Sequence, residues 1–174
     1  SAASDVYKRQ PTVWPILECD RQAHYTLHVM NEQIDAGPII DDIKVDIDER
    51  DTGYTLYGRL KERLPELLEL NLVSIIEGKY KSFEQDNSIA RYFSNELPNN
   101  GYIDCCWSVK RIERFIRALS SPDHPGALLN LDGEVLEVQE TLSLDLSEND
   151  FGKCGLIKQK NNEVSIYSRD GIIR

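Results

Sequence analysis

Residues 24–47 read HYTLHVMNEQIDAGPIIDDIKVDI, and this stretch decides the fold of the first half of the chain. Apolar and polar side chains alternate from Tyr25 to Val29, which is typical of a half-buried strand. A second alternation follows a polar loop over residues 31–38 that contains glycine and proline. We therefore expect two strands, over residues 24–30 and 39–47, joined by that loop.

A long helix is predicted after the second strand. Asp51 and Thr52 are residue types that cap helix N-termini, and Gly78 is a plausible end. Pro65 removes one backbone hydrogen bond, so we expect a kink or a break there. Leucine and isoleucine recur at steps of three and four, which gives one apolar face: Leu56, Leu60, Leu64, Leu67, Leu68, Leu72, Ile75 and Ile76.

The second half of the chain has a different pattern. Residues 80–101 are polar and end in Pro98-Asn99-Asn100-Gly101, which is typical of a linker. A short amphipathic helix is predicted over residues 107–119. After it, turn residues separate four short strand patterns, which indicate a small barrel or sandwich: 127–131, 134–140, 154–160 and 163–168.

Composition excludes several classes of protein. The 174 residues include 20 basic and 30 acidic side chains, so a field that gathers polyanions is not expected. No apolar run approaches the roughly 20 residues that span a bilayer, and no signal-peptide core is present, which favours a cytoplasmic protein without a membrane partner. The four cysteines lack zinc-site spacing, and we expect reduced thiols and no metal.

Several segments, taken in order, resemble a known family. Those in the first half are similar to the second half of the catalytic domain of folate-dependent formyltransferases. The later ones resemble the start of the C-terminal barrel domain of the methionyl-tRNA and amino-sugar formyltransferases. The segments are Pro11–Leu17, Thr26–Met30, Ile34–Ile40, Asp51-Thr52, Leu97–Asp104, Trp107, Ile116–Leu119 and Pro125–Ala127.

This resemblance implies an α/β region followed by an all-β region. Residues 11–88 would hold the last strands and a helix of a Rossmann-like sheet. Residues 89–101 would be a linker, and residues 102–174 a small OB-like barrel domain. Residues 1–10 carry no apolar periodicity, and we interpret them as a non-native leader.

The family's chemistry is attack by a primary amine on the formyl carbon of 10-formyltetrahydrofolate, assisted by an Asn, a His and an Asp. Only the aspartate has a matching position here, Asp35; the family's Asn-x-His motif does not occur in the sequence. The implied role of Asp35 is to hold the catalytic histidine in its working protonation state and to order a water that relays the amine proton. Gly37 of the same loop is implied in cofactor binding. The chain therefore resembles a fragment of the enzyme that is inactive alone.

Other side chains have weaker patterns. His28 could be read as catalytic, but the match places it in the sheet, where packing is its expected role. The pattern of His24 and His28 fits a sheet surface better than a metal site. Lys110, Arg114 and Arg117 fall on one helical face. They could bind a nucleotide-sugar phosphate or a tRNA backbone, or they could form an ordinary solvated face.

The acceptor of the formyl group is predicted from charge. Residues 101–174 carry nine basic and twelve acidic side chains, a net charge of −3, whereas a tRNA-binding domain is expected to be basic. An amino-sugar nucleotide is therefore favoured over methionyl-tRNA. A homodimer is possible, and the alternative from another class is a non-enzymatic β-domain that binds an oligosaccharide or RNA.

Overall fold

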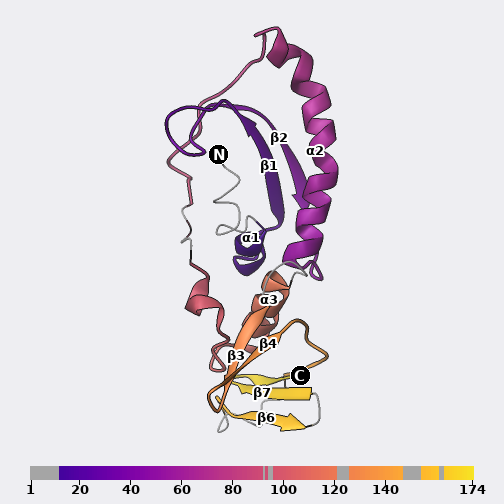
Figure 1. The fold of residues 1–174 in the computed structure, drawn as a ribbon, viewed down its shortest axis with the longest axis vertical. Coiled ribbons are helices and arrows are strands. Elements are labelled where there is room, and N and C mark those ends of the chain that lie inside the picture. The colour runs from indigo at the N-terminus through magenta and orange to yellow at the C-terminus, as the bar shows by residue number, and fades with distance from the viewer. Residues whose placement is uncertain (1–11, 92, 94–95, 121–125, 147–153, 161–162) are drawn as a thin grey trace.

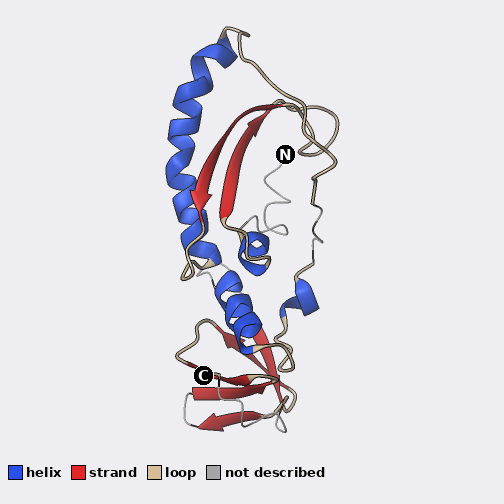
Figure 2. Cartoon of the chain, turned by 180° about the vertical axis from the view of Figure 1, so that it is seen from behind, coloured by secondary structure: helices blue, strands red, loops and turns tan. Residues whose placement is uncertain are grey.

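The computed structural model describes residues 12–91, 93, 96–120, 126–146, 154–160 and 163–174. The predicted leader, residues 1–10, lies outside them. The molecule is elongated: a hairpin with a long helix occupies one end, a cluster of short strands the other, and a short helix lies between them (Figures 1 and 2).

The predicted hairpin is confirmed. After the short helix α1 (Val13–Leu17), strands β1 (Gln22–His28) and β2 (Ile39–Asp46) pair antiparallel. Alternate side chains of both strands are buried or partly buried on one face. His24 on the other face is exposed and contacts Asp42, with 2.9 Å between Nδ1 and Oδ2. The register shifts between Leu27 and His28, so the end of β1 that leads into the loop is irregular.

The long helix α2 (Gly53–Ile76) packs against the hairpin. Thr52 caps it, because its hydroxyl accepts a hydrogen bond from the Thr55 amide while the Thr55 hydroxyl accepts one from the Thr52 amide. The predicted break at Pro65 is wrong, since one helix runs through this position. Pro65 is exposed, so water can reach the carbonyl that the missing amide leaves without a helical partner.

The predicted linker is docked rather than free. Before it, Phe83 exchanges two backbone hydrogen bonds with Ile39, of 2.8 and 2.9 Å. Within it, Arg91 pairs with Asp20 at 2.6 Å, and Phe93 stacks on Trp14 with ring centres 4.7 Å apart. The short 3-10 helix η1 (Pro98–Gly101) follows. Residues 83–91 and 93, which we call the return segment, therefore pack against the hairpin and α1.

Helix α3 (Val109–Leu119) joins the two ends of the molecule. Ser108 caps it by accepting a hydrogen bond from the Arg111 amide. One continuous core contains buried side chains from α1, β1, β2, α2, α3 and the later strands. The predicted regions 11–88 and 102–174 thus share their hydrophobic core across α3.

The remaining strands form two antiparallel sheets. Strands β3 (Ala127–Leu131) and β4 (Glu134–Val138) make a hairpin. The second sheet has the order β5-β8-β7-β6, with bounds Leu144–Asp145, Gly171–Ile173, Glu163–Ser168 and Ile157–Lys160. The sequence did not predict β5 and β8. Strand pairing between the two sheets is absent from the described ranges, so the OB-like barrel stays a prediction. Among all the residues that the structure describes, no helix is long and apolar enough to cross a membrane.

Candidate active site

The loop between β1 and β2 is shaped by a glycine. The Val29 amide donates to the Pro38 carbonyl at 2.9 Å, which closes the base of the loop. A Cβ on Gly37 would lie 1.6 Å from the Val29 carbonyl oxygen, so no larger residue fits this backbone. The tight return places residues 30–36 beyond the end of the sheet, as the indigo loop to the left of the upper end of the hairpin in Figure 1.

A side chain from the return segment holds this loop. The Gln85 amide nitrogen donates to the carbonyl oxygens of Asp35, at 2.8 Å, and Gly37, at 2.7 Å. Asp35 itself has a φ of 54°, in the left-handed region that aspartate tolerates better than most residues. The backbone around Asp35 is thus fixed from outside the hairpin, while the carboxylate remains exposed.

Asp35 lies beside a histidine. One carboxylate oxygen is 3.8 Å from Nε2 of His28, and the two side chains are 73% and 25% exposed. Nδ1 of His28 is 3.1 Å from the Val29 carbonyl oxygen, which can only accept a hydrogen bond. This contact favours the tautomer with the proton on Nδ1, so Nε2 is the basic nitrogen facing Asp35. The pair can accept a proton at Nε2 and stabilise the resulting charge.

The three predicted anion-binding residues lie together around a cavity of about 600 Å³. The Nε of Arg117 donates to Glu113 at 2.9 Å, and one of its terminal nitrogens donates to the Asp51 carbonyl. Arg114 donates to the Leu17 carbonyl at 3.3 Å, whereas Lys110 is exposed. The cavity has charges of both signs, because Arg21, Asp20, Asp48 and Glu49 also line it.

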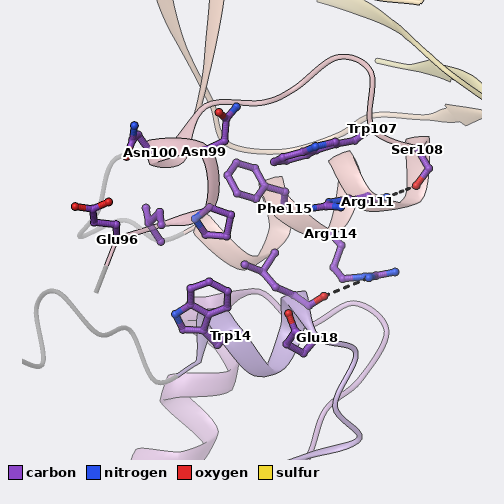
Figure 3. Close-up of a pocket in the computed structure, with 13 residues that line it drawn as sticks. Trp14, Glu18, Glu96, Asn99, Asn100, Trp107, Ser108, Arg111, Arg114 and Phe115 are labelled. Atoms are coloured by element: carbon purple, nitrogen blue, oxygen red, sulfur yellow. Dashed lines mark hydrogen bonds between the residues drawn. The ribbon is translucent and has the colours of Figure 1, made fainter. Parts of the chain in front are cut away.

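A larger cavity of about 780 Å³ is lined by aromatic side chains. Trp14 from α1 and Trp107 from the turn before α3 lie on opposite sides of it (Figure 3). The guanidinium of Arg111 lies 4.4 Å from the centre of the Trp107 ring. Flat rings and a stacked guanidinium can bind another planar group.

The structure brings the predicted site residues together as two separate groups. Asp35 and Gly37 lie beyond the C-terminal end of β1, whereas both cavities are lined by residues that precede its N-terminal end. A strand of seven residues extends about 23 Å. A ligand in either cavity must therefore extend along the sheet to reach Asp35.

No group of three or more His, Cys, Asp and Glu side chains among the described residues could hold a metal ion.

Comparisons with known proteins show which family this chain resembles. Residues 9–72 match the family model described as formyl transferase, a segment that includes Asp35 and Gly37. The chain is 34% identical over 125 residues to the GDP-perosamine N-formyltransferases of Brucella melitensis biotype 1 and Brucella abortus. The chain is similar to the formyltransferases over these residues. It spans about half the length of these relatives, since the match covers 72% of this chain and 48% of each Brucella formyltransferase.

Solved structures share the fold. The N-formyltransferase from Helicobacter canadensis, in complex with folinic acid and dTDP-3-aminofucose, superposes with a TM-score of 0.71 at 24% identity, over 93% of this chain and 58% of that one. A variant of HypX from Aquifex aeolicus gives 0.66 at 20% identity, over 93% of this chain and 29% of that one. The predicted resemblance to the formyltransferases, with their Rossmann-like fold, is confirmed.

Two residues of the candidate site came from the structure. Gln85 contacts Asp35 and Gly37, which lie 50 and 48 residues earlier in the chain. No local sequence pattern predicts a contact over this separation. His28 was expected to pack in the sheet. The register shift before it and its place in the strand that leads to Asp35 are the features that bring its ring to the carboxylate.

Proposed function

We propose that this chain is part of an enzyme that moves a formyl group from 10-formyltetrahydrofolate to the primary amine of a nucleotide-linked amino sugar. The observation that carries the proposal is an exposed carboxylate, Asp35, on a constrained loop inside the segment that matches the formyl transferase family. The Brucella relatives, named for an amino-sugar substrate, support the acceptor class.

Asp35 and His28 handle the proton in this proposal. An amine that forms a bond to a formyl carbon must lose a proton, and the nitrogen that leaves the formyl group must gain one. Nε2 of His28, 3.8 Å from the carboxylate, can take the first proton directly or through a water, and Asp35 stabilises the imidazolium. Gln85 contributes by fixing the loop backbone from which Asp35 projects.

The folate would supply the formyl carbon, but the described residues near Asp35 do not enclose it. Met30 and Ile34, the apolar side chains of the same loop, are 83% and 72% exposed. They offer an open surface instead of the enclosed pocket that a fused ring system requires. We assign most of the donor pocket to the part of the enzyme that this chain does not span, and we expect no turnover by the chain alone.

Lys110, Arg114 and Arg117 are proposed to bind a phosphate of the acceptor, remote from its amine. Their distance along the sheet from Asp35 suits a long acceptor that has its phosphate at one end and its amine at the other. Arg117 already donates to Glu113 and to the Asp51 carbonyl, whereas Arg114 makes one longer bond to the Leu17 carbonyl, so Lys110 and Arg114 are the better candidates for direct contact. The parent enzyme is proposed to be a cytoplasmic homodimer with an OB-like C-terminal domain.

The first test compares the chain alone with a restored enzyme. The restored enzyme joins this chain to the remaining part of the Brucella melitensis relative, and 10-formyltetrahydrofolate consumption with GDP-perosamine is measured for both. We expect turnover only by the restored enzyme. Turnover by the 174-residue chain, or a folded but inactive restored enzyme, would contradict the proposal.

The second test concerns the acceptor. Binding of the restored enzyme to initiator methionyl-tRNA across a salt series is compared with turnover of amino-sugar nucleotides. Submicromolar tRNA affinity with a steep salt slope would overturn the sugar assignment.

In the same enzyme, Lys110→Ala should raise KM for the sugar nucleotide several-fold and leave kcat nearly unchanged.

A further inference from the structure

Two exposed cysteines, 48 residues apart in sequence, meet in the C-terminal half of the molecule. Cys106 lies in the turn before α3, and Cys154 lies in the turn before β6. Their sulfur atoms are 3.0 Å apart, with the Cys154 thiol donating to Cys106. A pair this close needs only a small shift to reach the disulfide length of about 2.05 Å.

Backbone hydrogen bonds hold both turns in place. The Cys106 amide donates to the Asp104 carboxylate at 2.8 Å, and the Trp107 amide donates to the Asp104 carbonyl at 3.0 Å. On the other side, the Gly155 amide donates to the Tyr167 carbonyl at 2.9 Å. The sulfur contact therefore arises between two anchored turns.

We propose that Cys106 and Cys154 are an oxidation site that forms a reversible disulfide with hydrogen peroxide. A sulfur of the pair attacks the peroxide and becomes a sulfenic acid, with release of one water; the other sulfur then displaces the hydroxyl oxygen as a second water. The two thiols lose two protons and two electrons, and the peroxide is reduced to two waters. A dithiol such as dithiothreitol reverses the bond by exchange.

The geometry favours Cys106 as the first sulfur to react. The hydrogen bond that the Cys154 thiol donates to Cys106 raises the pKa of Cys154 to about 11, so Cys154 stays a thiol at neutral pH. Cys105 competes poorly, because it is partly buried and burial raises the pKa of its thiol. Cys154 is accordingly the resolving cysteine.

The bond would act on the aromatic cavity. Trp107, which follows Cys106 directly, lines that cavity together with Trp14. A disulfide would link the turn that contains Trp107 to the turn before β6, and it would restrict the movement of Trp107 at the cavity.

Peptide mapping of the 174-residue chain tests the site. The chain is treated with a small excess of hydrogen peroxide, blocked with iodoacetamide and cut with trypsin, which separates residues 92–110 from residues 154–158. We expect these two peptides to be joined, with two hydrogens lost, in the wild type and in Cys19→Ser and Cys105→Ser. The link should be absent in Cys106→Ser and Cys154→Ser.

Two further measurements keep the outcome clear. Dimedone should label the sulfenic acid trapped at Cys106 in Cys154→Ser, and Cys106→Ser should lose that label. Oxidation should raise Tm of the wild type and Cys19→Ser by about 5 to 10 °C, with no rise in Cys106→Ser. A link through Cys105, links only between chains, or no link would overturn the proposal.

Discussion

Helices α2 and α3 are both amphipathic in sequence, but they are used differently. In α3, six of eleven residues are buried, and they form much of the shared core. In α2, only four of 24 residues are buried. A stripe beside the buried face carries Leu68, Leu72 and Ile76 at four-residue steps, and they are 42%, 51% and 75% exposed, although the sequence pattern placed them on one face with the buried leucines.

The difference separates the part of the molecule that holds the fold together from the part that carries the proposed chemistry. The buried side of α3 is packed in the core, so substitutions there should act on stability. The hairpin and α2 are packed on one side only, and their exposed apolar stripe marks a surface suited to a further protein segment. Substitutions at the loop of the hairpin should act on turnover instead.

The largest expected effect is on turnover. In the restored enzyme, Asp35→Asn should lower kcat by about 10² to 10⁴-fold, because the amide cannot stabilise a protonated His28. Substrate KM should change little, and Tm should be unchanged because the carboxylate is exposed. The measurement is steady-state kinetics beside a melting curve, with Glu32→Gln in the same loop as control. Near-normal kcat in Asp35→Asn would remove the assigned role.

The next effect is on stability. Phe115 of α3 is 1% exposed, so Phe115→Ala should lower the free energy of unfolding by about 3 to 5 kcal/mol. Leu72→Ala on the exposed stripe of α2 should change it by less than about 0.5 kcal/mol. Urea unfolding of the 174-residue chain measures both. Equal losses would contradict the conclusion that α3 is more tightly packed than the exposed stripe of α2.

A pair of glycines should respond with opposite signs. Gly37→Ala places a methyl group against the Val29 carbonyl and should cost about 1 to 3 kcal/mol of stability, with turnover lost as the Asp35 loop shifts. Gly58→Ala in α2 meets nothing within 4 Å and should add about 0.5 to 1 kcal/mol. Thermal melting of both variants, with turnover in the restored enzyme, checks the signs. A stable Gly37→Ala variant would show that the loop has other backbone paths.

The last comparison concerns an arginine that joins the two regions. Arg117 on α3 bonds the Asp51 carbonyl just before α2, so Arg117→Ala should lower unfolding free energy by about 1 to 3 kcal/mol. Arg63→Ala, which removes an exposed ion pair with Glu66, should cost less than about 0.5 kcal/mol. Urea midpoints compare them. If Arg117→Ala leaves stability unchanged but raises KM for the acceptor, its role is in binding alone.

The sequence predicted the elements whose signals are local. The hairpin, the Thr52 cap, both helices and the strands at 127–131 and 163–168 follow from periodicity and turn residues, which act over a few positions. The break predicted at Pro65 was wrong because the destabilisation by a helical proline depends on where the unpaired carbonyl points. On the exposed side of α2, water can bond to that carbonyl.

The missed features all depend on distant partners. Strands β5 and β8 have two and three residues, too few to show alternation, and exist because they pair with each other and with β7. At the site, Asp35 and Gly37 came from the family resemblance. The contact of Gln85 with their loop depends on how α2 and the return segment bring it back, which no local pattern encodes.

Because Gln85 holds the loop between β1 and β2, the position of that loop depends on the length of α2. The chain leaves the hairpin, runs through 24 helical residues and returns to place one amide against two carbonyls. Inserting a single helical turn, about 5.4 Å, would carry the reversal point outward and withdraw Gln85 unless the return segment lengthened as well. Changes in length should therefore be tolerated only in matched pairs, one in the helix and one in the segment that follows it.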